Sequence, residues 1–163
     1  KRQAYDISIR YTDDFLARLI GMLQEQNTDA AMLYTSDHGE DIFDDSRRLF
    51  LHASPVPSYY QIHVPFLLWM SDSYRDHYPS LWENTISNKQ KNISSSASFF
   101  HTMLELGGVT TPYRNDSLSV VNVLFTEKPR VYLNDHNEAR SLNEIGMGEE
   151  DFEMLQQKGI LYR

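Results

Sequence analysis

The chain has 163 residues, of which 40% are hydrophobic and 12% are aromatic, and it carries a formal net charge of −8. This length corresponds to one domain with a sizeable core, and the composition is typical of a globular protein. The acidic balance, with no basic stripe along the sequence, argues against non-specific binding to nucleic acid. Because the chain has no cysteine, disulfides, thiolate metal ligands and cysteine nucleophiles are excluded.

No apolar run approaches the roughly 18 residues of a membrane-spanning helix, and no signal-like segment opens the chain. The sequence starts Lys1-Arg2-Gln3, without a Met. We therefore expect residues 1–163 to be a single domain that is part of a longer protein.

The first 70 residues predict one helix and two buried strands. Residues 5–26 place apolar side chains at helical spacing, with charged side chains on the other side. Residues 30–34 and 64–70 are short apolar runs, which are typical of buried parallel strands. Residues 41–60 have mixed charge and little periodicity, so they predict a loop of a length that often carries function.

The rest of the chain predicts short elements joined by polar segments. In chain order these are a short helix at 74–82, a loop at 84–98 that ends in a serine-rich helix start, a core helix at 98–106, a turn-rich segment at 111–127, an edge strand at 130–134 and a helix at 149–158. The alternation of helices with buried strands predicts an α/β fold with a mostly parallel sheet sandwiched by helices.

A pair of metal-binding residue types follows the strand at residues 30–34. Asp37 and His38 stand where that strand gives way to a loop, and ligands collect outside the carboxyl ends of strands in α/β sheets. Neighbouring residues on a regular strand point to opposite faces, so both reach one ion only in a turn, which Gly39 permits. Such a pair suits Zn²⁺ or Mn²⁺ better than Ca²⁺ or Mg²⁺, but two ligands alone do not close a coordination shell. Alternatively, Asp37 caps the turn and His38 only hydrogen-bonds.

Three motifs in this region resemble the catalytic domain of the alkaline phosphatase superfamily. They are Ser-Asp-His-Gly-Glu at residues 36–40, Leu-His at residues 51–52 and the apolar strand at residues 64–69. The helices at residues 5–16 and 98–109 are also similar to helices of that family. The resemblance is strongest to the membrane-anchored phosphoethanolamine transferases, which modify lipid A and related envelope glycans. It implies that the chain is the C-terminal portion of a sulfatase-like catalytic domain.

The resemblance also implies roles for individual residues. Asp37 and His38 match two ligands of a tightly bound zinc ion. His52 matches a histidine that binds a second zinc ion or contacts the substrate phosphate, and Glu40 is expected behind His38 as an orienting group. The family's Thr nucleophile, an acidic ligand and a further histidine come from segments that this chain does not contain. A His-Asp pair that often opens the later helix is also missing, because residues 96–98 read Ser-Ala-Ser.

In a complete parent enzyme, the resemblance implies ping-pong transfer of phosphoethanolamine from a phospholipid donor, phosphatidylethanolamine, to a glycan acceptor. It implies a protein of the bacterial inner membrane with its catalytic domain in the periplasm. We expect the 163-residue chain alone to be inactive.

Two enzymatic alternatives and one non-enzymatic alternative remain open. A sulfatase would bind Ca²⁺, and a phosphoglycerol transferase of the lipoteichoic-acid type would commonly use Mn²⁺. The non-enzymatic alternative is a binding fragment that kept the fold and lost the chemistry. If neighbouring strands are supplied by another part of the parent, the sheet edge is free and the chain is expected to form a homo-oligomer through it.

The remaining histidines and one charge cluster are expected to be structural. His63, His77, His101 and His136 are interpreted as surface or packing residues rather than ligands. Asp44-Asp45 and Arg47-Arg48 are interpreted as a solvated charge cluster.

Overall fold

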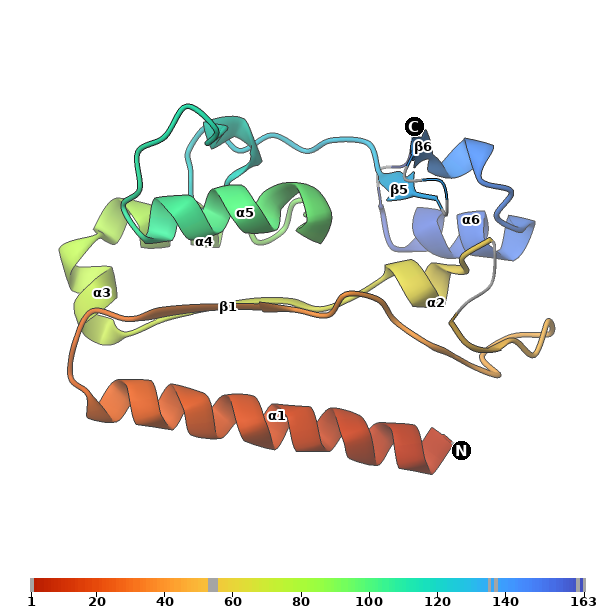
Figure 1. Ribbon diagram of the computed structural model, residues 1–163, viewed down its shortest axis with the longest axis horizontal. Helices are drawn as coiled ribbons and strands as arrows, with labels where there is room; N and C mark the ends of the chain where they lie inside the picture. Colours follow the sequence, from red (N-terminus) through yellow and green to blue (C-terminus); the bar gives the residue numbers. More distant parts are fainter. Residues whose placement is uncertain (1, 53–55, 135, 137, 161, 163) are drawn as a thin grey trace.

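A computed structural model of the chain describes residues 2–52, 56–134, 136, 138–160 and 162. Helix α1 (Arg2–Glu25) lies along one side of a pair of strands, and helices α4 (Pro79–Asn88) and α5 (Ser95–Leu106) lie on the other side (Figure 1). The strands are β1 (Ala31–Thr35) and β4 (Phe66–Met70). The predicted α/β sandwich of helix, sheet and helix is therefore present.

The direction of this strand pair differs from the prediction of a mostly parallel sheet. β1 and β4 pair antiparallel, from Ala31 opposite Met70 to Thr35 opposite Phe66. Every strand pair among the described residues is antiparallel. A parallel pair needs a crossover that packs on the sheet, whereas the chain between β1 and β4 turns back beyond the strand ends (Figure 1).

The segment that was predicted as a loop, residues 41–60, contains short regular elements. β2 (Asp41–Ile42) and β3 (Phe50–Leu51) form a small antiparallel hairpin. It is followed by a single-turn helix, α2 (Tyr59–Ile62), whose N-cap Ser58 accepts a hydrogen bond from the Gln61 amide. Elements of two to four residues leave too little periodicity to be recognised in the sequence.

Helix α1 forms as the spacing of its apolar residues predicts, but the rest of the protein buries little of its surface. None of its described residues is buried. Leu16, Leu19, Ile20 and Leu23 are half-buried, while Ile9 and Phe15 are 55% and 58% exposed. The N-terminal end of the helix is held by Arg2, which donates hydrogen bonds to the carbonyls of Ile42 and Phe43 at 3.1 and 2.6 Å.

The helices after β4 extend further into the predicted loop than expected. Ser71 caps α3 (Asp72–His77), because its side chain accepts a hydrogen bond from the Tyr74 amide. The predicted loop at residues 84–98 is wrong at its start, because α4 continues to Asn88. Its predicted serine-rich helix start is confirmed, since α5 begins at Ser95. The Asn88 side chain is buried and donates hydrogen bonds to the carbonyls of Val120 and Asn122. Such distant partners stabilise a polar helix end that local sequence cannot reveal.

Two apolar clusters form the core. The first joins β4, α3 and α5 to the segment after η1 (Asp116–Leu118); its buried members are Met70, Tyr74, Leu106, Val120, Val121 and Phe125. The second joins α2 to η2 (Leu142–Glu144) and α6 (Glu149–Gln157); its buried members are Tyr59, Leu142, Met147 and Leu155. The predicted strand at residues 130–134 appears as β5 (Val131–Leu133), which pairs with β6 (Ala139–Ser141).

Candidate metal centre and adjoining cavity

The motif at residues 36–40, called here the 36–40 turn, leaves the end of β1 and presses against α2. The Gly39 amide donates a hydrogen bond to the Gln61 carbonyl at 2.7 Å. A Cβ atom on Gly39 would lie only 2.0 Å from the Tyr60 carbonyl oxygen. Gly39 is therefore required because two backbones approach closely, rather than because the turn needs an unusual dihedral angle.

A buried carboxylate joins the end of the turn to α2. Asp41, which is 2% exposed, accepts hydrogen bonds from Ser58 Oγ at 2.7 Å and from Gln61 Nε2 at 2.5 Å. Both oxygens of this buried acid are therefore satisfied, as a buried charged group requires. The turn is fixed to α2 through the backbone of Gln61 and through the side chains around Asp41.

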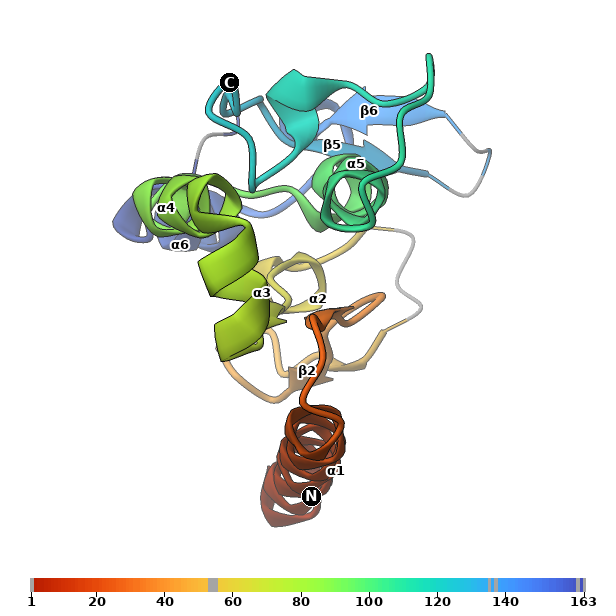
Figure 2. The same ribbon diagram turned by 90° about the vertical axis from the view of Figure 1, so that its left-hand side faces the viewer.

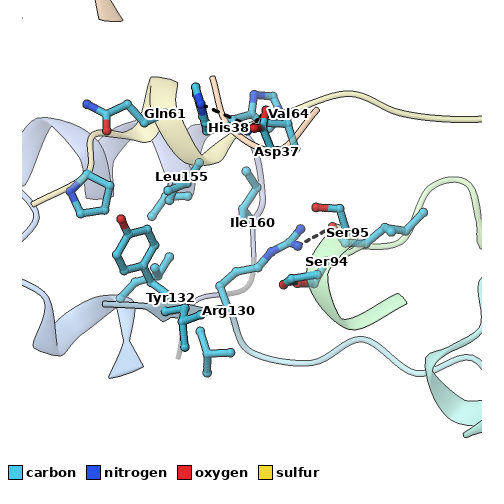
Figure 3. A pocket seen from close by; sticks show the side chains of 18 of the residues that line it. Asp37, His38, Gln61, Val64, Ser94, Ser95, Arg130, Tyr132, Leu155 and Ile160 are labelled. Carbon is cyan, nitrogen blue, oxygen red and sulfur yellow. Dashed lines mark hydrogen bonds and ion pairs between the residues drawn. The ribbon is translucent and has the colours of Figure 1, made fainter. Parts of the chain in front are cut away.

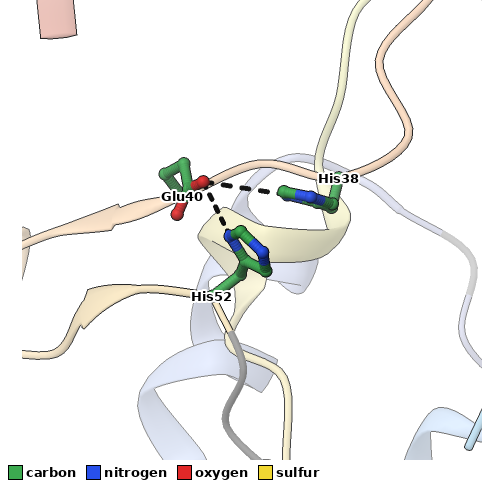
Figure 4. Close-up of side chains that lie close together, drawn as sticks. All are labelled: His38, Glu40 and His52. Atoms are coloured by element: carbon green, nitrogen blue, oxygen red, sulfur yellow. Dashed lines mark hydrogen bonds and ion pairs between the residues drawn. The ribbon is translucent and has the colours of Figure 1, made fainter.

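His38, Glu40 and His52 come together beside the turn (Figure 4). Glu40 Oε1 lies 2.7 Å from His52 Nδ1 and 3.9 Å from His38 Nδ1. The two imidazole rings are 3.8 Å apart between centroids. One ligand atom from each of the three residues lies within 4.8 Å of the others. Glu40 Oε2 is buried and has no hydrogen-bond partner among the described residues.

Asp37 lies outside this group, on the other side of the His38 ring. Its side chain is 88% exposed, and its Oδ2 lies 3.7 Å from His38 Nε2. Its Oδ1 accepts a hydrogen bond from the His38 amide at 3.0 Å. That backbone hydrogen bond, followed by attraction to the His38 ring, holds the pKa of Asp37 below its usual value. Asp37 is therefore ionised at neutral pH, as a metal ligand must be.

The donor atoms suit a zinc ion. Two ligands of tetrahedral zinc lie about 3.3 Å apart when each bond is about 2.0–2.1 Å long. The 3.7 Å separation of Asp37 Oδ2 and His38 Nε2 is close to this value. His38 Nδ1 lies 3.0 Å from the Gly39 carbonyl, so donation of Nδ1–H to that oxygen would leave Nε2 free to bind the metal. In the opposite tautomer, Nδ1 would instead be free to bind a metal beside Glu40 and His52.

Three other histidines make the structural contacts expected of them. His63 Nδ1 lies 2.7 Å from the Tyr59 hydroxyl. His77 pairs with Asp29 at 2.8 Å. His101 Nδ1 accepts a hydrogen bond from the Asn115 amide at 3.1 Å.

The interpretation of Arg47 and its neighbours as a solvated charge cluster is wrong for Arg47 and Asp45. The Arg47 guanidinium lies 2.6 Å from Asp45 and forms two hydrogen bonds, at 2.6 and 2.8 Å, with Asp151. Asp151 is 1% exposed and also accepts a hydrogen bond from the Tyr59 amide at 2.8 Å. The hydrogen bonds with Asp151 raise the pKa of Arg47 above its usual value, and those with Asp45 raise it to a lesser degree. The partner lies 104 residues away, so no local pattern reveals the pair.

A cavity of about 700 Å³ opens beside the 36–40 turn. Asp37, His38 and His52 lie at its polar side, with apolar walls from the segment leading into β4 and from the C-terminal elements. Figure 3 shows Asp37 and His38 on one side and Arg130 and Tyr132 on the other. Apart from the site residues discussed above, the lining is mostly apolar and includes Ile62, Val64, Phe66, Val131, Leu133, Leu142, Leu155 and Ile160.

Residues 1–109, two thirds of the chain, match the family model described as Sulfatase, and the chain belongs to that family. It is 29% identical over 127 residues to phosphoethanolamine transferase EptC of Escherichia coli K12, covering 77% of this chain and 21% of EptC. It is 32% identical over 114 residues to phosphoethanolamine transferase EptA of the same strain, covering 67% of this chain and 20% of EptA. The chain therefore spans about one fifth of the length of the curated relatives it matches.

Solved structures of periplasmic domains are similar to this fold. The C-terminal periplasmic domain of EptC from Escherichia coli in complex with Zn has a TM-score of 0.68 and 25% identity, covering 86% of this chain and 39% of that chain. The corresponding domain of EptC from Campylobacter jejuni has a TM-score of 0.59 and 26% identity, covering 73% and 37%. The expected alkaline-phosphatase-like α/β class is confirmed, and zinc is the metal suggested by the first of these structures.

These relatives also bear on the expected location. The similar solved domains are periplasmic by their descriptions. Among the described residues, no helix combines the length and apolar character that a membrane crossing requires.

Proposed function

We propose that this chain is the C-terminal part of a zinc-dependent phosphoethanolamine transferase. The parent would move phosphoethanolamine from phosphatidylethanolamine to lipid A or another envelope glycan, with its catalytic domain in the periplasm and its anchor in the inner membrane. The observation that carries the proposal is the 36–40 turn at the end of β1, which holds Asp37 and His38 with two donor atoms 3.7 Å apart. The similarity to EptC and EptA supplies the type of reaction.

In this proposal, Asp37 and His38 are zinc ligands contributed by the chain. The bound zinc supplies positive charge that favours the alkoxide of a nucleophile and the negative oxygens of a phosphoryl group. The hydrogen bond from Gly39 to Gln61 holds the turn in place, and the Gly39 carbonyl fixes the His38 ring through Nδ1. The Thr nucleophile would come from an upstream part of the parent.

His52 and Glu40 act as a pair beside the zinc ligands. The 2.7 Å contact between them places a carboxylate behind the imidazole, an arrangement that fixes the orientation of a histidine. His52 would bind a second zinc ion or donate a hydrogen bond to the substrate phosphate. Glu40 Oε1 also lies 3.9 Å from His38 Nδ1, so the Glu40 carboxylate is close to both imidazole rings.

Zinc binding by the 163-residue chain tests the ligand assignment. We expect Asp37→Ala and His38→Ala each to weaken zinc binding at least about tenfold, measured by isothermal titration calorimetry. The control is His136→Ala, whose backbone contacts lie in the β5–β6 connection, away from the turn. Unchanged zinc affinity in both ligand variants would contradict the assignment.

The reaction is tested in the parent protein with a fluorescent phosphatidylethanolamine donor. Asp37→Ala in the parent is expected to abolish release of the diacylglycerol product, and the 163-residue chain alone is expected to release none. Hydrolysis of an aryl sulfate by the parent, without any headgroup transfer, would instead identify a sulfatase. Measurable transfer by the purified 163-residue chain would contradict the expectation that its nucleophile lies elsewhere.

A further inference from the structure

Arg130 is a half-buried cation whose hydrogen-bonding capacity is largely unused. It precedes β5 and lines the cavity. Its guanidinium donates a hydrogen bond to the Ile93 carbonyl, at the entrance to α5. A guanidinium has five N–H donors, and the described part of the chain accepts from one of them, with no ion pair to a carboxylate. Withdrawing such a charge from water without a paired anion is unfavourable.

The electrostatic surroundings of Arg130 do not supply this anion. Burial lowers the pKa of Arg130, while the charge of Glu127 raises it to a lesser degree. Glu127 Oε1 itself accepts hydrogen bonds from the backbone and side chain of Asn92. Asp37 is the only carboxylate among the described residues that line the cavity, and it belongs to the wall formed by the 36–40 turn (Figure 3).

Positive charges act on His63, which lines this part of the cavity, although the whole chain has a net charge of −8. The charges of Lys158 and Arg130 both act to lower the pKa of His63, after the larger effect of desolvation. Ser94 and Ser95, at the start of the twelve-residue helix α5, lie beside Arg130 in Figure 3. The unpaired amides of a first helical turn favour an anion as well.

The apolar lining restricts the type of anion. Ile62, Leu133 and Ile160 belong to the same cavity as Arg130, so a ligand that fills it must offer apolar surface together with a negative group. A guanidinium forms paired hydrogen bonds with phosphate oxygens. A small, fully hydrated anion would form such hydrogen bonds less well in an apolar cavity.

We propose that Arg130 forms an anion subsite, opposite the 36–40 turn, for a phosphate group attached to an apolar carrier. This inference deepens the proposed function, because it names a recognition residue for the ligand of the same cavity. The phosphate belongs either to a phosphodiester of a donor lipid or to a phosphomonoester of an acceptor. Arg130 is a binding residue that selects the ligand and positions it toward Asp37 and His38.

Binding of short amphiphiles to the metal-free 163-residue chain tests the subsite. Hexyl phosphate, dihexanoyl phosphatidylethanolamine and hexanol are titrated in EDTA while amide and arginine side-chain signals are followed by NMR. We expect at least one of the two phosphates to bind and to shift the signals of Arg130 and of Ser94–Ser96, and hexanol to bind at least about tenfold more weakly. The tighter of the two phosphates identifies the monoester or the diester as the source. Equal binding of hexanol and both phosphates, or shifts confined to other surfaces, would overturn the proposal.

Variants separate the guanidinium from general effects of charge. Arg130→Gln is expected to weaken binding of the preferred phosphate about tenfold, and Arg130→Lys to restore part of the loss because it keeps the charge without the planar fork. Arg140→Gln is the matched control, because Arg140 is exposed and paired with Glu138. Wild-type affinity in a folded Arg130→Gln variant would overturn the proposal. If that variant does not fold, the mapped NMR shifts of the wild-type chain decide.

The subsite and the proposed function fail independently. His38→Ala is expected to lose zinc affinity but to retain phosphate binding in EDTA, because Arg130 lies on the opposite wall (Figure 3). Absence of zinc binding in the wild-type chain would contradict the zinc-ligand assignment and leave the subsite intact. If zinc binds as expected but Arg130→Gln does not weaken phosphate binding, the subsite alone is overturned.

Discussion

At the scale of single residues, Gly39 shows how a motif can be identified correctly while its physical cause is misjudged. The sequence indicated that Gly39 eases a turn. The structure shows instead that its missing side chain lets the 36–40 turn contact the backbone of α2, where a Cβ would lie 2.0 Å from the Tyr60 oxygen. Asp37 and His38 could be selected as candidates because they are adjacent and follow a strand. The contact between Glu40 and His52 could not be derived from spacing, because the hairpin that creates it is too short to predict.

Gly39→Ala is expected to destabilise the chain by about 2–4 kcal/mol, because the turn must separate from α2 and lose the Gly39–Gln61 hydrogen bond. Urea unfolding measures this change. Gly21→Ala is the matched control: it lies in α1 with no atom within 4 Å of the added carbon, and it should stabilise the chain by about 0.5–1 kcal/mol. A Gly39→Ala variant as stable as wild type would contradict the close contact.

His63 is expected to make stability depend on pH. Desolvation lowers its pKa in the folded state below the usual value near 6.5, so the unfolded chain binds the proton more readily. The contribution is fully present above about pH 6.5 and is lost as the pH falls toward the folded-state pKa. Urea midpoints measured in EDTA at about pH 7.5 and 5.5 should therefore differ less in His63→Gln than in wild type. If the difference between the two midpoints decreases equally in the control His136→Gln, a group other than His63 is responsible.

At the scale of elements, the C-terminal helix α6 stabilises the segment that carries His52. Asp151 in α6 connects to Arg47 and to the Tyr59 amide, and Tyr59 begins α2, against which the 36–40 turn packs. The sequence predicted α6 within one residue of its observed end. Its role was not predicted, because the contacts of Asp151 with Arg47 and with the Tyr59 amide span 104 and 92 residues.

Asp151→Asn is expected to destabilise the chain by about 3 kcal/mol, because Arg47 loses a buried charged partner and keeps only Asp45. Glu150→Gln is the control, since Glu150 is the exposed neighbour in the same helical turn. The midpoint of urea unfolding reports both changes. Hydrogen exchange should also show faster exchange of the Tyr59 amide in Asp151→Asn, and equal exchange would contradict the connection.

At the scale of the whole molecule, the helices and buried strands were largely predictable, whereas the way they pair was not. The apolar residues of the two helices located α1 and α5, and continuous apolar runs located β1 and β4, because each covers one or more helical turns or several strand residues. The antiparallel pairing of β1 with β4 depends on where the connecting chain runs, and periodicity carries no information about that. Arg130 was not predicted as a functional residue, because its contact with Ile93 spans 37 residues and depends on how the elements pack.

The exposed apolar side of α1, formed by Ile7, Tyr11, Phe15 and Met22, is expected to drive self-association. This surface differs from the sheet edge through which the sequence predicted a homo-oligomer. Phe15→Lys is predicted to reduce the weight-average mass measured by multi-angle light scattering at high concentration, because Phe15 is 58% exposed and the substitution places a charge on that side. Gln3→Lys adds the same charge at an exposed polar position of α1 and serves as the control. A wild-type chain that stays monomeric at high concentration would contradict the prediction.

The cavity is assembled from two parts of the chain, one inside and one outside the match to the sulfatase family model. Its wall with Asp37 and His38 lies inside the region that matches the sulfatase family, residues 1–109, whereas Arg130, β5 and α6 lie outside that region. Substitutions in the C-terminal part can therefore change which ligands the cavity accepts without altering the residues of the 36–40 turn.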